Sequence, residues 1–265
     1  MPSVQSGQLE AQSQAIAASF GNTDRLVRQL DLHFELYMQR ARRPGQSRRK
    51  ASLLPSYEVP APVMRQLRQE LTPLAAKDGK QGLALAEALW ARRTREHRQL
   101  AAALLGSLPK GSLRRVGARV ARWGEENRDE RVMEALAVAG CQRMRSEDPA
   151  SLLRLCGRLF KRREVRMRAT GLLAMKALME EDSVDNLPAM LDLLRPMAQN
   201  PAKGLRPYLL RVFETLAKLS PGEALYFLQQ RLVESPEAGT RWLARQSMRF
   251  LPSQEAQWLE EALEG

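Results

Sequence analysis

The feature that most constrains the fold is a segment that returns along the chain: a short polar lead, an arginine, then an apolar stretch. It recurs at intervals of 33 to 40 residues, at Arg98, Arg131, Arg166, Arg206 and Arg241. In the copy at residues 163–182, apolar residues come back every three or four positions, which places them on one face of an α-helix. Recurrence at this length indicates stacked units of two helices each.

We therefore expect an all-α fold, an α-solenoid of HEAT-like two-helix repeats, in which the second helix of each unit begins at the arginine. The repeat domain is predicted over residues 61–265 as one curved body. Residues 1–60 are predicted to hold N-terminal helices that pack on it, with a partly disordered basic loop. Within the repeats we expect one helix over 112–123, ended by Gly124, and a single helix over 128–145.

The loop at residues 41–62 is marked by its Pro, Gly and Ser content. It carries the densest basic run in the chain, formed by Arg42, Arg43, Arg48, Arg49 and Lys50. Two interpretations stay open for this run, a solvated linker and a segment that contacts phosphate.

The charge balance is strongly basic, with a net charge of +12 and a pI of about 10.4. An excess of this size is typical of proteins with a polyanionic partner. Two cysteines, Cys141 and Cys156, are too few for a zinc cluster or a disulfide framework. With no apolar run long enough to span a bilayer, we expect a cytoplasmic protein associated with the nucleoid, without metal, cofactor or membrane contact.

Equivalent positions of a superhelix line up along one side, so the recurring arginines predict a basic row that can follow a phosphate backbone. The same position in a two-helix unit also suits hydrogen bonds or ion pairs between repeats, and both roles stay open. Nearby basic residues extend the row. The predicted DNA-binding residues are Arg98, Arg131, Arg162, Arg163, Arg166, Arg168, Lys203, Arg206, Arg211, Arg241 and Arg245.

Residues 56–108 carry a resemblance to a known family through an aromatic start, a Leu-Trp dipeptide and a Glu-led helix. The matching residues are Tyr57, Val59, Pro62, Arg65, Leu89, Trp90, Glu96 and Ala101. In these the chain resembles the HEAT-like DNA alkylation repair glycosylases, over roughly residues 50–250. The resemblance implies a C-shaped solenoid that holds duplex DNA on a basic concave face and releases N3- or N7-alkylated purines.

The family's catalytic motif is where the chain departs from it. The motif implies an aromatic face for a cationic base and a carboxylate for an oxocarbenium-like transition state. Matched at Asn127, the Trp position holds Arg128 and the last Asp position holds Val132. The catalytic hypothesis is therefore that three other residues replace the family's motif: Trp123, Glu126 and Asp129. In the alternative, Trp123 packs at a helix end and the acids cap the next helix.

Two functions follow from the sequence. The first is a DNA-binding HEAT-like repeat protein that resembles alkylation repair glycosylases and holds duplex DNA by phosphate contacts, with catalysis altered or missing. If the chain is an enzyme, it is a DNA glycosylase that releases alkylated purines. The second is a non-catalytic scaffold for protein partners, because solenoids commonly present a concave face to them. In either case we expect a monomer.

Overall fold

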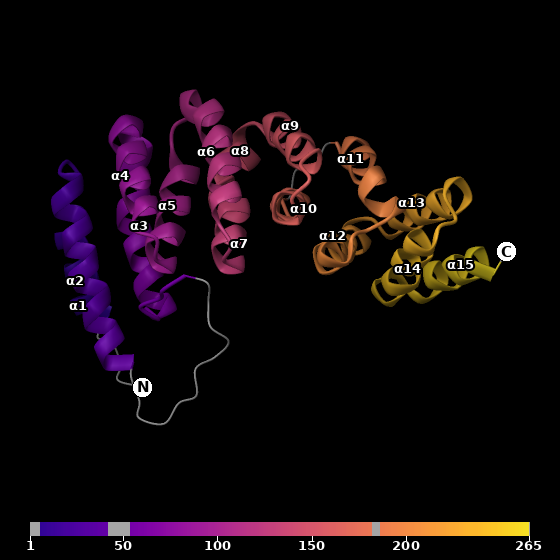
Figure 1. The fold of residues 1–265 in the computed structure, drawn as a ribbon, viewed down its shortest axis with the longest axis horizontal. Coiled ribbons are helices and arrows are strands. Elements are labelled where there is room, and N and C mark those ends of the chain that lie inside the picture. Colours follow the sequence, from indigo (N-terminus) through magenta and orange to yellow (C-terminus); the bar gives the residue numbers. More distant parts are fainter. Residues whose placement is uncertain (1–5, 42–53, 182–185, 265) are drawn as a thin grey trace. The chain divides into compact units, whose positions relative to one another are not determined.

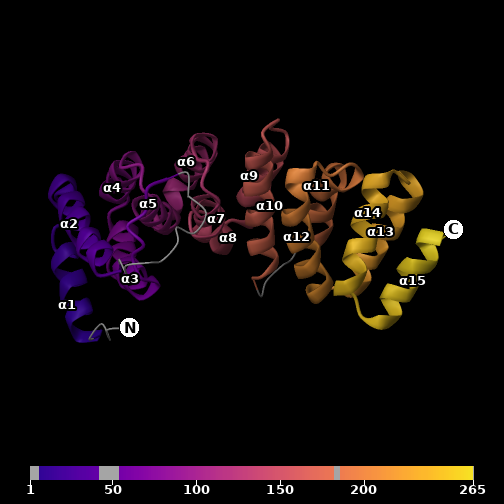
Figure 2. The same ribbon diagram turned by 60° about the horizontal axis from the view of Figure 1, so that its bottom comes forward.

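A computed structural model describes residues 6–41, 54–181 and 186–264 of the chain. All regular secondary structure in these ranges is helical, which confirms the predicted all-α class (Figures 1 and 2). The chain divides into two compact units, Met1–Glu147 and Asp148–Gly265. The basic run from Arg42 to Lys50 lies outside the described residues. No helix in the described ranges is long and apolar enough to cross a membrane.

The first unit begins with the N-terminal helices. Its helices are α1 (Ser6–Ala17), α2 (Thr23–Ala41), α3 (Ala61–Lys77), α4 (Gly79–Ala91), α5 (Arg95–Ser107), η1 (Lys110–Ser112), α6 (Leu113–Glu126), α7 (Glu130–Val138) and α8 (Gln142–Glu147). Helices α1, α3, α5 and α7 pack one against the next, and α2 packs against α4. From α1 to α7, the odd-numbered helices thus each contact the second-next helix in the chain.

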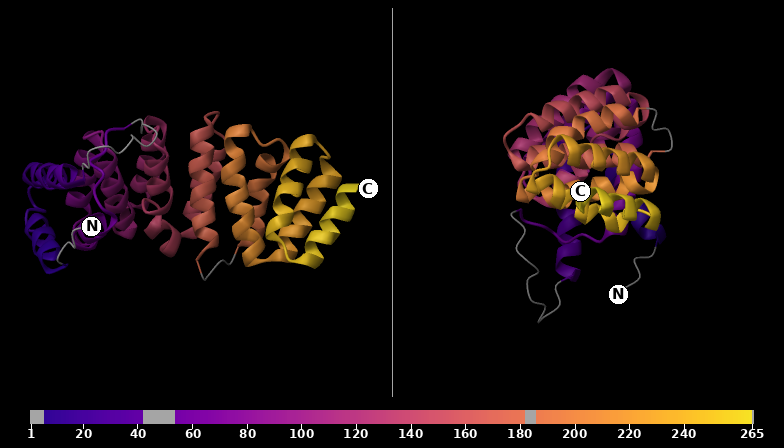
Figure 3. Two further views of the ribbon diagram at one scale, coloured as in Figure 1. Left: turned by 90° about the horizontal axis from the view of Figure 1, so that it is seen from below. Right: turned by 90° about the vertical axis from the view of Figure 1, so that its right-hand side faces the viewer.

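The second unit repeats this arrangement in two layers (Figure 3). Its helices are α9 (Pro149–Phe160), α10 (Val165–Met179), α11 (Leu187–Gln199), η2 (Lys203–Leu205), α12 (Arg206–Leu219), α13 (Pro221–Glu234), α14 (Ala238–Ser247), η3 (Met248–Phe250) and α15 (Ser253–Glu264). One layer holds α9, α11, α13 and α15, and the other holds α10, α12 and α14.

Helix α10 is the core element of the second unit. Nearly every residue from Met167 to Met179 is buried, because α9 and α12 pack against it. Gly171 permits the close approach of α9, since a Cβ there would lie 2.7 Å from Cε1 of Phe160.

The two cysteines, Cys141 and Cys156, are both buried. Burial raises the pKa of the Cys141 thiol to about 12, so the thiol stays protonated and unreactive.

Two helix boundaries differ from the sequence-based expectations. Helix α6 continues through Gly124 to Glu126. The helix expected over 128–145 is instead broken into α7 and α8. The break lies where α5 crosses, because a Cβ on Gly106 would lie 1.8 Å from the carbonyl oxygen of Ala139. The contact that interrupts the helix therefore comes from a segment more than thirty residues away.

Candidate nucleic-acid interface

The second helices of the second unit begin side by side. A Cβ on Gly204, in η2, would lie 3.0 Å from Cγ1 of Val165, the first residue of α10. At the next repeat, the Thr240 hydroxyl donates to the Gln199 carbonyl at 3.1 Å. These contacts place the starts of α10, α12 and α14 in one continuous row.

This row, which we call the basic row, carries an excess of exposed cations. Its exposed members are Lys161, Arg162, Arg163, Lys203 and Arg241. Two acids lie beside them, Glu164 and Glu237, at the N-caps of α10 and α14. Only Arg162 is ion-paired within the described part of the row, to Glu164 at 3.6 Å. The other four cations have no carboxylate partner among the described residues.

The helix dipoles add to the positive potential of the basic row. None of α10, α12 and α14, all of them fully described, has an acidic residue in its first turn. The N-terminus of a helix is the positive end of its dipole. An anion bound at the basic row is therefore attracted both by the helix dipoles and by the cations. The pKa of Glu164 is lowered by its own backbone N–H and by the charges of Arg162 and Arg166.

The first unit has a shorter version of the row. The starts of α5 and α7 are joined by an ion pair between Arg95 and Asp129 at 3.4 Å. Arg93, Arg128 and Arg131 are exposed there and pair with no carboxylate in the described ranges. Of these three, Arg131 alone was among the residues predicted from the sequence, because it holds the recurring arginine position. Arg93 and Arg128 precede the helix, in the same turn position as Lys161 to Arg163.

Arg98 does not lie at the surface. Its guanidinium stacks on the Trp90 ring, with Cζ 4.4 Å from the ring centroid, and its Nε donates to the Trp90 carbonyl at 3.4 Å. Burial lowers the pKa of Arg98, and the nearby charge of Glu126 partly offsets this effect. Since both partners are buried, Arg98 stabilises the contact between α4 and α5 and is not available to a phosphate.

Arg206 has a similar role between repeats. Its Cζ lies 4.4 Å from the centroid of the Trp242 ring, and its Nε donates to the carbonyl of Pro201 at 3.4 Å. The side chain is half-buried. Arg206 thereby joins α12 to α14, which is the inter-repeat role that the sequence left open.

The remaining predicted binding residues lie on the bodies of the helices. Arg166 and Arg168 are half-buried on α10, and Arg168 donates to the Arg163 carbonyl at 3.3 Å. Arg211 is half-buried on α12, whereas Arg245 is exposed on α14, one turn after Arg241. The structure thus separates the predicted set into exposed cations of the basic row and arginines held within the fold.

The three candidate catalytic residues are all engaged in contacts within the first unit: Trp123 and Asp129 are buried, and Glu126 is exposed. The Trp123 ring is 1% exposed and stacks on Trp90, with centroids 4.5 Å apart and an interplanar angle of 4°. The indole N–H of Trp90 donates to Oε2 of Glu126 at 2.9 Å, and Arg122 donates to its Oε1 at 3.0 Å. Because its ring is covered, Trp123 has no face that a base could occupy.

The carboxylates of Glu126 and Asp129 both accept hydrogen bonds from neighbouring groups of the first unit. Partial burial of Glu126 acts to raise its pKa, but hydrogen bonds from Trp90 and Arg122 outweigh this, and the pKa is lowered. Asp129 caps α7 by accepting from the backbone N–H of Val132 at 3.1 Å. This is the capping role that the alternative interpretation of the sequence assigned to Asp129.

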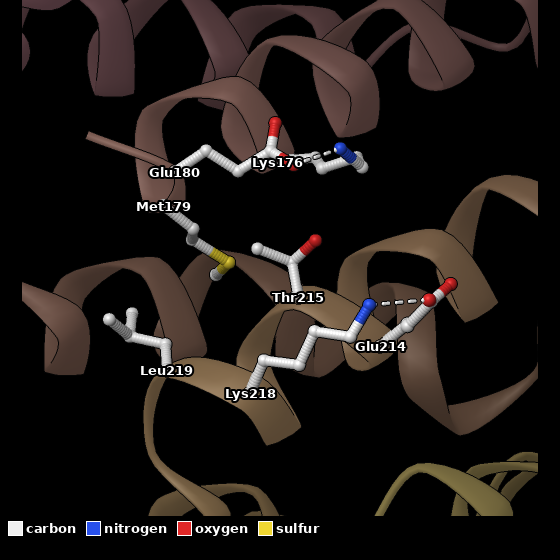
Figure 4. Close-up of a pocket in the computed structure, with 7 residues that line it drawn as sticks. All are labelled: Lys176, Met179, Glu180, Glu214, Thr215, Lys218 and Leu219. Carbon is white, nitrogen blue, oxygen red and sulfur yellow. Dashed lines mark hydrogen bonds and ion pairs between the residues drawn. The ribbon is translucent and has the colours of Figure 1, made fainter.

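Two shallow hollows lie away from these residues. One, of about 340 Å³, lies between the C-terminal parts of α10 and α12 (Figure 4). Ion pairs line it, Lys176 with Glu180 at 2.5 Å and Lys218 with Glu214 at 2.7 Å. The other, of about 270 Å³, lies between α3, α5 and α8. No cluster of metal-ligating side chains occurs among the described residues.

Comparisons of the chain with protein-family models, with curated proteins and with solved structures find no match. The basic row and the covered Trp90–Trp123 pair are therefore the features from which a function can be inferred.

Proposed function

We propose that the chain is a HEAT-like solenoid that binds duplex DNA through its phosphates, without releasing bases. The observation that carries the proposal is the basic row of the second unit, where Lys161, Arg163, Lys203 and Arg241 are exposed and have no carboxylate partner in the part of the chain that the structure describes. Unpaired cations along adjacent helix starts suit a regularly spaced polyanion. The packing of alternate helices on one another, from α1 to α7 in the first unit and throughout the second, supports the solenoid part of the proposal.

Duplex DNA fits this surface better than a single strand does. Binding of single strands relies on exposed aromatic rings on which bases stack. In the described part of the row, the aromatic rings at the helix starts are those of Tyr208 and Trp242, and both are half-buried. Contacts to the backbone alone do not read sequence. We therefore propose binding that is indifferent to sequence and steeply dependent on salt.

Base release is not part of the proposal, because the aromatic face that it requires is occupied. Trp123 is stacked on Trp90, and Arg98 brings a positive charge against the same pair. A cationic alkylpurine would be repelled by Arg98 and would find no free ring for a cation–π contact.

The test is fluorescence anisotropy with a short labelled duplex, run beside a base-release assay on methylated DNA. The triple variant K161Q/R163Q/K203Q removes three exposed cations of the row, and we expect it to bind about tenfold more weakly or worse. The matched control K77Q/K80Q/K110Q loses the same charge from exposed lysines in turns of the first unit, at the opposite ends of its helices. Equal losses in the two variants would reduce the effect to net charge and contradict the proposed row.

A protein scaffold is the second candidate, and the hollow between α10 and α12 favours it. Met179 and Leu219 give this hollow an apolar floor between the two ion pairs (Figure 4). Such a surface suits an extended peptide with both apolar and charged side chains. Substitution of Leu219, which is exposed, by Gln would weaken a protein partner and leave DNA binding unchanged, so the two candidates can be separated in one pair of assays.

A further inference from the structure

Two helices, α2 in the first unit and α15 in the second, have apolar side chains on faces that no other part of the described chain covers. On α2, Leu32 and Leu36 are 64% and 49% exposed. On α15, Trp258 is 44% exposed. Each helix already buries its opposite face, α2 against α4 and α15 against α13 and α14. A helix that shows apolar residues on two faces usually has a partner on each.

The exposed face of α2 is a continuous stripe. Leu32 and Leu36 are one turn apart, and Arg28 lies one turn before Leu32 on the same side. Arg28 is exposed and has no carboxylate partner in the described ranges. Asp24 and Glu35 lie at the flank of the stripe and are exposed too. The stripe therefore offers two leucines and a free guanidinium.

The exposed face of α15 has the complementary chemistry. Its sequence contains four glutamates and no basic residue. Glu255 and Glu261 lie one turn before and one turn after Trp258, so an acid flanks the ring in either direction along the helix. Large aromatic side chains such as Trp commonly form the energetic centre of protein interfaces.

We propose that α2 of one copy of the chain docks on α15 of a second copy, with Trp258 against Leu32 and Leu36 and Arg28 against Glu255 or Glu261. The contact joins two different surfaces, so it is heterologous and can extend head to tail. One helix face on another buries less than a standard interface, so the association is weak and reversible. The chain is then a monomer when dilute, as the sequence predicts, and self-associates when concentrated. This proposal is independent of DNA binding.

Sedimentation velocity without DNA, from micromolar to millimolar protein, tests the proposal. We expect the weight-average sedimentation coefficient of the wild type to rise with concentration and that of L32Q/L36Q or W258Q to stay at the monomer value. The control V233Q removes an exposed valine from α13 and should behave as the wild type does. A wild type that stays monomeric throughout, or a V233Q variant that loses association equally, would overturn the proposal.

A charge exchange identifies the partner helix. Arg28→Glu alone and E255K/E261K alone should each weaken association, because each places like charges together. A mixture of the two should associate, since the glutamate of one then meets the lysines of the other. Failure of the mixture to regain association would exclude α15 as the occupant of α2. Unchanged thermal unfolding of each variant shows that the fold is retained.

Discussion

The basic residues around the start of α5 and those of the turn before α10 serve different purposes. In the first unit the arginines at the start of α5 are held within the fold: Arg92 by Asp31, Arg95 by Asp129 and Arg98 by Trp90. In the second unit the turn before α10 leaves Lys161 and Arg163 exposed, with no carboxylate partner among the residues that the structure describes. An arginine at a repeat position is thus a packing element where an acid or a tryptophan faces it, and a surface cation where none does. Substitutions at these positions should therefore mainly lower the stability of the fold in the first unit and mainly weaken DNA binding in the second.

The largest effect is expected in the aromatic network of the first unit. Trp123→Ala removes a fully buried ring from its stack on Trp90 and should lower the free energy of unfolding by roughly 3–5 kcal/mol. Urea denaturation measures this loss. Trp258→Ala is the matched control, because that ring is exposed, and it should cost far less. Equal losses would contradict the central place of the Trp90–Trp123 pair.

Acid should destabilise the first unit through His97. Burial lowers the pKa of His97 to about 4, despite the nearby charge of Asp31. The unfolded chain therefore binds this proton more readily than the folded chain, so stability falls as the pH drops below the unfolded value near 6.5. Between pH 6.5 and about pH 5 the loss should be roughly 2 kcal/mol.

NMR titration of the His97 ring, with unfolding measured at each pH, checks this prediction. His97 contacts Thr94 through Nδ1 at 2.6 Å and packs against Phe34 and Tyr57. A ring that titrates at its ordinary pKa would show that the cluster is open to water and would remove the expected loss.

For DNA binding, in contrast to stability, we expect the larger effect from substitutions in the second unit. R93Q/R128Q/R131Q removes three exposed cations from the first unit, and K161Q/R163Q/K203Q removes three from the second. We expect the second-unit variant to lose about tenfold in affinity, or roughly 1.4 kcal/mol, and the first-unit variant to lose less. The reason is that α5 and α7 each have an acid in the first turn, Glu96 and Glu130, whereas α10, α12 and α14 have none. A larger loss in the first unit would reverse the comparison.

The smallest effect is expected at Glu126. Its carboxylate is largely exposed, and solvent screens its interactions with Arg122 and Arg98. Glu126→Gln should therefore lower the free energy of unfolding by less than about 1 kcal/mol. Because the pKa of Glu126 is lowered in the folded state, its contribution is present at neutral pH and is lost as the pH falls through that value. Acid unfolding of the variant beside the wild type measures the difference.

Much of the fold could be predicted from the period of the apolar residues. The segment around α10 has an unbroken helical pattern, and the structure forms the helix there. The break between α7 and α8 could not be predicted, because it depends on the approach of Gly106 from α5. Likewise, Gly124 does not end α6, since the buried Trp123 ring holds the last turn in place and Asn127 closes it by donating its backbone N–H to the Trp123 carbonyl.

The sequence could predict which arginines lie at the candidate site, but not whether their side chains face solvent or pack on a tryptophan. Sequence periodicity located Arg98 and Arg206, but it carried no signal that tryptophans stand beside both. Trp90 lies eight residues before its arginine, whereas Trp242 lies 36 residues after, so no common spacing identifies the pairs. The exposed cations Arg93 and Arg128 could not be predicted from the repeat, because they do not occupy the recurring arginine position.

The most direct test of the account is the salt dependence of duplex binding by the wild type and by K161Q/R163Q/K203Q, measured between about 50 and about 200 mM salt. If the basic row contacts phosphates, the logarithm of the binding constant falls linearly with the logarithm of salt concentration, and the variant's slope is shallower by about 2.5 to 3. Parallel slopes for the two proteins, or a wild type that does not bind duplex DNA at the lowest salt, would contradict it.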